Sequence, residues 1–186
     1  MSKTSAAAAK ALTSSHFELF GLAPAFALDL ARLDTAYRDI QAKVHPDRFA
    51  HAGDAERRAS MQMTTRVNEA YRTLKSPVQR AKYLLELNGV DVAFETNTAM
   101  PPEFLVQQME IREKLEEAKK ASDLDFLSRE LAVERREIES RIREKIDDKR
   151  DFAGASDLVR KLMFLERFGE DIDAAYEVIE TRIAGS

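Results

Sequence analysis

The chain has 186 residues, of which 33% are charged, with a net charge of −4 and no cysteine. The lack of cysteine excludes disulfides and thiolate metal sites, and no apolar run approaches the length of a membrane span. Few glycines and prolines, many charged residues and no long strand-like alternation together predict an all-α fold.

Charge is spread unevenly along the chain. Residues 16–88 carry 11 basic and 9 acidic residues, whereas residues 89–186 carry 16 basic and 24 acidic residues. Neither half is basic enough to suggest nucleic acid as a partner. The mildly basic first half and the acidic second half suit different partners.

Residues 1–15 are poor in large apolar side chains, which predicts a disordered extension. This segment is free of acidic residues, as a mitochondrial transit peptide would be, but no arginine occurs before Arg32. It also lacks the apolar centre of a secretory signal. This segment therefore favours a cytoplasmic protein, with the mitochondrial matrix as the alternative.

The first predicted elements are a short helix from His16 that ends at Gly21 and a longer helix that Asp29 can cap. The apolar residues of the longer helix recur every three or four positions, as do those of a further helix after it. The two sets are Leu30, Leu33, Tyr37, Ile40 and Val44, and Met63, Val67, Ala70, Tyr71 and Leu74. Pro46 ends the first of these two helices at the preceding residue, which predicts an antiparallel helical hairpin with His45, Pro46 and Asp47 at its exposed tip.

Two cations on the first hairpin helix lie on one side of it. Arg32 and Lys43 are eleven residues apart, which is close to three full turns, whereas Arg38 lies elsewhere around the helix. A solvated face is the plain interpretation of such a pair. Next to the tip, these residues predict a docking face for an acidic partner, with Arg38 as a further candidate.

Ser76-Pro77 ends the second hairpin helix, and a short helix follows with Tyr83, Leu84 and Leu87 as its expected buried residues. Asn88-Gly89 stops this helix, and residues 88–102 are predicted to connect two domains.

The second half predicts three more helices. The first, over residues 102–121, has a core stripe of Phe104, Ile111, Leu115 and Ala118. Leu105 and Met109 lie on its opposite side, with Val106, Glu110, Glu113 and Glu117 beside them. Scattered surface residues are common, but an apolar pair edged by glutamates predicts a partner site.

A second helix is expected over residues 123–152, with Leu127, Leu131, Ile138 and Ile142 pointing inward, and Ala153-Gly154 as the turn that follows. The last helix has one long apolar seam that Gly169 could interrupt, and Phe164 lies off this seam, either as a flank of the core or as an exposed contact. The three helices predict an antiparallel bundle.

The tripeptide His45-Pro46-Asp47 between amphipathic helices, with the run VNEAYRTL at residues 67–74, resembles a J-domain. The resemblance implies an N-terminal domain that contacts a DnaK-like chaperone and stimulates its ATP hydrolysis. Chaperone-ATPase binding is then expected at His45, Pro46 and Asp47, and the charge pattern adds Arg32, Lys43 and Arg38.

Residues 80–85, 104–117 and 159–165 resemble the HscB family of iron–sulfur co-chaperones, and the similarity extends from His16 to the C-terminus. The resemblance implies that the chain binds the scaffold IscU, delivers it to the chaperone HscA and stimulates the ATPase of HscA. The scaffold-binding positions that it implies are Leu105, Val106, Met109, Glu110, Glu113, Glu117 and Phe164. The domains expected are an extension at 1–15, a J-domain at 16–87, a linker at 88–102 and a scaffold-binding three-helix domain at 103–186.

Two other functions compete with this one. The chain could be a J-domain co-chaperone for another client or for general protein folding, although it lacks the Gly/Phe-rich linker of general co-chaperones. It could also be an enzyme or metal protein that uses His45, Asp47 and His51. No further ligand, nucleophile or glycine-rich loop accompanies these three residues, so we expect no catalytic residue, metal or cofactor.

Overall fold

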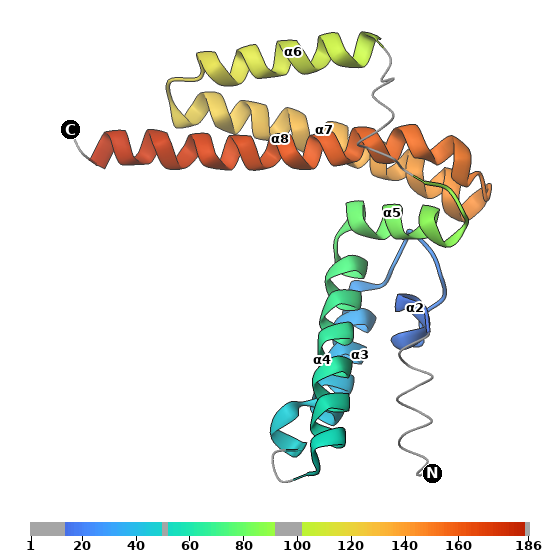
Figure 1. The fold of residues 1–186 in the computed structure, drawn as a ribbon. Coiled ribbons are helices and arrows are strands. Elements are labelled where there is room, and N and C mark those ends of the chain that lie inside the picture. The colour runs from blue at the N-terminus through green and yellow to red at the C-terminus, as the bar shows by residue number, and fades with distance from the viewer. Residues whose placement is uncertain (1–13, 50–51, 92–101, 185–186) are drawn as a thin grey trace. The chain divides into compact units, whose positions relative to one another are not determined.

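The structure is a computed structural model, and it describes residues 14–49, 52–91 and 102–184. All regular secondary structure in these ranges is helical, which confirms the predicted all-α class (Figure 1). The chain divides into two compact units, Met1–Leu84 and Leu85–Ser186. The predicted extension, apart from Ser14 and Ser15, and residues 92–101 of the predicted linker lie outside the described residues.

The first unit opens with the short helix α2 (His16–Leu19). The Ser15 hydroxyl and the Glu18 side chain form a reciprocal capping box at its start. Gly21 ends it with a φ of 63°, a left-handed conformation that allows the Leu22 N–H to reach the Phe17 carbonyl. This turn buries three apolar side chains, namely Phe17, Phe20 and Leu22.

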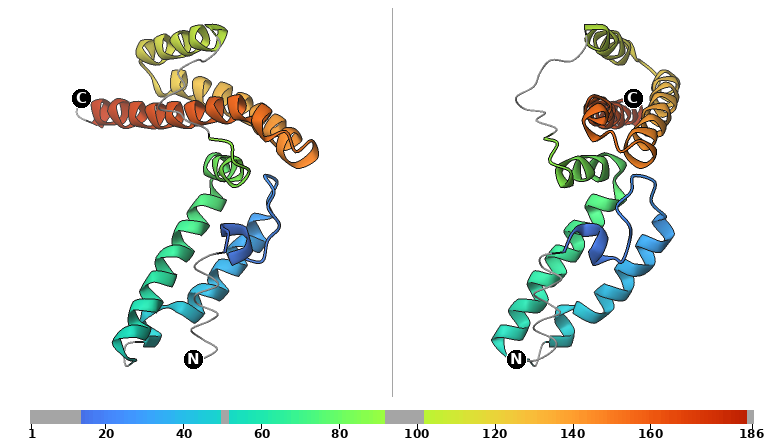
Figure 2. Two further views of the ribbon diagram at one scale, coloured as in Figure 1. Left: turned by 45° about the vertical axis from the view of Figure 1, so that its right-hand side comes forward. Right: turned by 90° about the vertical axis from the view of Figure 1, so that its right-hand side faces the viewer.

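Helices α3 (Leu30–Val44) and α4 (Asp54–Lys75) form the predicted antiparallel hairpin (Figures 1 and 2). The Asp29 carboxylate accepts a hydrogen bond from the Arg32 N–H at 3.1 Å and caps α3, as its sequence position predicts. The apolar stripes of the two helices face each other, and their fully buried members are Leu33, Val67, Ala70 and Leu74. Helix α2 packs on α4 and braces the hairpin.

Helix α5 (Pro77–Leu87) follows directly and ends before Gly89, which has a φ of 72°. Leu84 is buried as expected, but the expectation that Leu87 is buried is wrong because it lies in the last turn, off the inward stripe. That stripe is formed by Val78, Ala81 and Leu85. Arg80 is buried as well. Its guanidinium donates to the carbonyl of Phe26, which precedes α3, and to the carbonyl of Leu74 in the last turn of α4.

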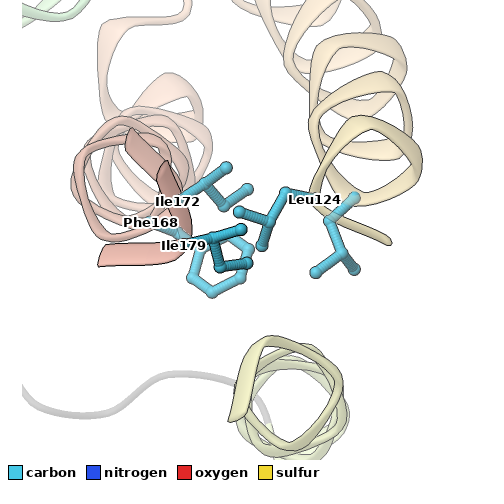
Figure 3. Close-up of a cluster of buried hydrophobic side chains, with 5 residues drawn as sticks. Leu124, Phe168, Ile172 and Ile179 are labelled. Atoms are coloured by element: carbon cyan, nitrogen blue, oxygen red, sulfur yellow. The ribbon is translucent and has the colours of Figure 1, made fainter. Parts of the chain in front are cut away.

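The second unit contains α6 (Pro102–Glu117), α7 (Ala121–Arg143) and α8 (Phe152–Ala184), which confirms the three predicted helices. Its buried cluster consists of Leu124 and Leu127 from α7 and Phe168, Ile172 and Ile179 from α8 (Figure 3). The core stripe predicted for α6 packs against this cluster through Ile111, Leu115 and Ala118. Within the described ranges, no helix is long and apolar enough to cross a membrane.

The end of α7 differs from the prediction. Helix α7 stops at Arg143 and continues as a π-helix, η2 (Glu144–Asp148), which turns Ile146 into the core. The chain then reverses at Arg150, whose φ is 56°. The Asp151 carboxylate accepts a hydrogen bond from the Gly154 N–H at 2.8 Å, so Ala153-Gly154 lies in the first turn of α8 and is not the loop that we expected.

Helix α8 also continues without a break through Gly169. A Cβ atom at this position would lie 3.6 Å from a methyl carbon of Leu131, which is ordinary van der Waals contact. The glycine therefore neither breaks the helix nor is required by a close approach of α7.

Candidate functional site

The hairpin tip begins where α3 ends. The backbone of His45 turns to a φ of −56° and a ψ of 131°, the extended geometry that a following proline favours. Pro46–Phe49 then form one turn of 3₁₀-helix, η1. The sequence Pro46-Asp47 thus sets the point at which the chain leaves α3.

Side chains from both flanks hold the last carbonyls of α3, which have no partner within the helix. Arg48 donates to the Ala42 carbonyl at 2.8 Å. The hydroxyls of Ser60 and Thr64 on α4 donate to the Val44 carbonyl at 2.7 and 3.2 Å. These bonds fix the tip to α4 without using the side chains of His45 or Asp47.

Further along the hairpin, the VNEAYRTL run connects α4 to α3. Tyr71 stacks on Tyr37 with ring centroids 4.0 Å apart, and the Tyr37 hydroxyl donates to the Asn68 side chain at 3.0 Å. The Gln41 amide also donates to Asn68. Such a partly buried polar and aromatic set fixes how the two helices are aligned, and it thereby sets the position of the tip.

Asp34 on α3 joins this set from the outside. It accepts hydrogen bonds from the Tyr71 hydroxyl at 2.8 Å and from the Lys75 ammonium at 3.4 Å. The Tyr71 hydrogen bond, with help from Lys75, lowers the pKa of the Asp34 carboxyl below its ordinary value. Asp34 is therefore ionised at neutral pH and adds a second link between the helices.

The side chains of His45 and Asp47 are 53% and 90% exposed. The Asp47 N–H lies 3.3 Å from His45 Nδ1, and the Asp47 carboxylate lies 3.5 Å from the same nitrogen. Among the described residues no group of three acidic or histidine side chains could hold a metal ion, and His51 lies outside them. The tip therefore presents an oriented imidazole and a carboxylate to solvent.

The three predicted docking cations are all exposed on α3. The guanidinium of Arg32 reaches back to the Gly21 carbonyl at 3.5 Å, and that of Arg38 donates to the Asp34 carbonyl at 3.2 Å. Lys43 makes no ion pair with any residue that the structure describes, so its charge is available to a partner.

The second candidate site is the outer surface of α6. Leu105, Val106 and Met109 are 48%, 55% and 63% exposed, and we call these three residues the α6 patch. Glu110, Glu113 and Glu117 are exposed beside it. Phe104, on the other side of the helix, is buried, so α6 has the two faces that its periodicity predicts.

The resemblance implies that Phe164 is a scaffold-binding position, but its side chain is less exposed than those of the α6 patch. It is partly buried and makes an edge-to-face contact with Phe104, with ring centroids 5.6 Å apart. The Arg112 guanidinium lies 5.9 Å from the centre of its ring. Phe164 is thus a flank of the core, because the seam between α6 and α8 takes up most of its surface.

Polar contacts also link helix α6 to α7, beside the apolar packing of its core stripe. Gln107 donates to Glu134 at 3.1 Å, and Lys114 lies 3.4 Å from the Glu130 carboxylate. Burial raises the pKa of the Glu134 carboxyl above its ordinary value. Gln108 is buried next to Phe104 in the core stripe, and neither atom of its amide has a hydrogen-bond partner among the described groups.

The sequence predictions missed several residues that build these sites. Ser60 and Thr64 hold the end of α3, and Gln41 aligns the two hairpin helices through Asn68, although the periodicity places all three close to an apolar stripe. On α7, Phe126 and Val133 are more than half exposed, and no prediction included them.

Comparison with known proteins identifies the family. A family model described as the HSCB C-terminal oligomerisation domain matches residues 100–173. The co-chaperone protein HscB homolog of Burkholderia thailandensis is 53% identical over 172 residues, which are 91% of this chain and 98% of the relative. The chain belongs to the HscB co-chaperone family. It is therefore a co-chaperone, and the expectation of a role in iron–sulfur cluster biogenesis is supported at the level of the family.

Solved HscB structures share the fold of the chain. Human HscB matches with a TM-score of 0.84 at 30% identity, over 87% of this chain and 82% of the human one. HscB of Vibrio cholerae matches with a TM-score of 0.80 at 32% identity, over 89% of this chain and 99% of the other. These matches extend over both units, so the predicted architecture of a J-domain followed by a helical C-terminal domain is confirmed.

Proposed function

We propose that this co-chaperone binds an iron–sulfur scaffold protein of the IscU type through the α6 patch and its glutamates. It then delivers the scaffold to a DnaK-like chaperone of the HscA type and stimulates the ATPase of that chaperone through the hairpin tip. The sequence relative comes from Burkholderia, so the bacterial cytoplasm is the compartment that we expect.

The α6 patch is the observation that carries this proposal. Three large apolar side chains remain exposed on a helix whose opposite face is already buried, so they contribute little to the fold. An apolar centre with a charged rim is the usual composition of a protein–protein contact. The acidic rim also indicates that the partner is basic at the matching positions.

The tip supports the other half of the proposal. Backbone and α4 contacts fix its position, whereas the imidazole of His45 and the carboxylate of Asp47 take almost no part in holding the fold. Arg32, Arg38 and Lys43 lie on α3, the helix that leads to the tip. The tip would supply specific contacts with the ATPase, and the three cations would supply positive charge toward an acidic surface of it.

Steady-state ATP hydrolysis by HscA, measured with and without IscU, tests the proposal. We expect His45→Gln to abolish the stimulation and to leave IscU binding unchanged, while Arg72→Gln, an exposed change near the other end of α4, retains both. Added salt should weaken the binding of the wild-type chain to HscA if Arg32, Arg38 and Lys43 act by charge. A folded His45→Gln chain that still stimulates the ATPase would refute the role of the tip.

A further inference from the structure

Helix α7 exposes a second apolar pair outside the α6 patch. Phe126 and Val133 are 53% and 58% exposed. They are seven residues apart, which is close to two helical turns, so they lie on the same side of α7. Neither is part of the buried cluster that α7 forms with α8.

The pair lines a groove on the outside of the α6–α7 contact. The groove is bounded by Gln107 of α6 and by Phe126, Glu130, Val133, Glu134 and Glu137 of α7. Gln107 follows directly after Val106 of the α6 patch. Consecutive residues point about 100° apart around a helix, so a partner that covers both the α6 patch and the groove must extend around the side of α6.

The charge of the groove indicates what could occupy it. Glu130, Glu134 and Glu137 supply three carboxylates, and Arg129 is the one cation among the groove residues. Lys114 lies near Glu130, and the charge of Lys161 acts on Glu134. The hydrogen bond that Glu134 accepts comes from the neutral Gln107 amide, and burial penalises the charged form of its carboxyl. A lysine or arginine entering the groove would relieve this penalty.

A second copy of the chain fits the groove less well. Residues 89–186 carry 24 acidic against 16 basic residues, so two copies would bring acidic surfaces together.

We propose that the α6–α7 groove is a second docking site for the iron–sulfur scaffold and takes a basic segment of it; this rests on the function proposed above. The segment would place two apolar side chains about 10 Å apart, the rise of seven residues in a helix, over Phe126 and Val133. Lysine or arginine side chains beside them would pair with Glu134 and Glu137. The scaffold would thus be held at two places, the α6 patch and the groove.

Calorimetric titration of the full chain with purified IscU tests this site. Phe126→Ser combined with Val133→Ser should weaken binding about fivefold to tenfold, because apolar contacts on the partner would be lost. Val178→Ser is the matched control, since Val178 is 57% exposed on α8 and lines no part of the groove. Glu137→Gln, which removes one exposed charge without altering the apolar pair, should weaken binding about twofold to fivefold and reduce its salt dependence.

The outcomes separate the two proposals. If the double serine variant binds normally while Leu105→Ala with Met109→Ala does not, the groove is not a scaffold site and the proposed function stands. If the wild-type chain does not bind IscU at all, both proposals fail. If the double serine variant has a lower average mass than the wild-type protein in sedimentation equilibrium but binds IscU with unchanged affinity, a second copy of the chain occupies the groove and the inference is wrong.

Discussion

Truncation of the exposed side chains of the α6 patch tests whether they serve scaffold binding or the stability of the fold. In the Leu105→Ala, Met109→Ala variant, two exposed side chains lose most of their apolar surface and the core stripe of α6 is untouched. We expect weaker scaffold binding with little change in the melting temperature, because these side chains face a partner and not the bundle.

The size of the effect follows from the exposure of the two side chains. Complete burial of a leucine or methionine side chain is worth about 1.5–3 kcal/mol. Leu105 and Met109 are 48% and 63% exposed, so about half of that value is left for a partner to bury at each position. Truncation of both should therefore cost about 2 kcal/mol of binding free energy, which is close to a thirtyfold rise in Kd.

Ile172 supplies the contrast, since it is 1% exposed within the core of the same unit. Ile172→Ala leaves a cavity and should lower the free energy of unfolding by about 2–5 kcal/mol. Titration with IscU gives the binding constants, and thermal melts followed by circular dichroism give the stabilities. If the Leu105, Met109 variant melts as early as Ile172→Ala, the assignment of the two faces of α6 is wrong.

Three further predictions concern stability. Gly169→Ala should raise the free energy of unfolding by about 1 kcal/mol in urea denaturation, because it removes a mid-helix glycine and its Cβ meets only a Leu131 methyl at 3.6 Å. Gly154→Ala should instead lower it, since its Cβ would collide with the Asp151 carboxylate that caps α8. Burial lowers the pKa of His16 below 6.5, so the unfolded chain binds this proton more readily than the folded one. The free energy of unfolding should therefore fall as the pH drops through about 6.5, and His16→Phe should reduce that fall.

Much of the fold could be predicted because its signals are local. A proline after His45 and the apolar repeat on either side are enough to specify a hairpin with its tip. The two faces of α6 likewise follow from a period of 3.6 residues, which separates Phe104 from Leu105 without reference to any other helix.

Features that depend on pairing between elements were not predictable in the same way. The depth of Phe164 depends on how closely α8 approaches Phe104 on α6. Gln41 and Asn68 lie near apolar stripes, but their hydrogen bond exists only when α3 and α4 take one alignment. Gly154 resembles a helix breaker in the sequence. In the fold, the absence of a side chain at Gly154 leaves room for the carboxylate of Asp151, which caps α8.

Gln108 has a consequence for how firmly α6 is held. An amide buried without a hydrogen-bond partner costs about 1–3 kcal/mol, and it lies in the stripe that attaches α6 to its neighbours. Helix α6 should therefore detach by local unfolding before α7 and α8 do, and its backbone amides should exchange with deuterium sooner. A partner that binds the α6 patch would stabilise the state in which α6 is packed on α7 and α8. Part of the binding free energy would therefore be used to suppress this local unfolding.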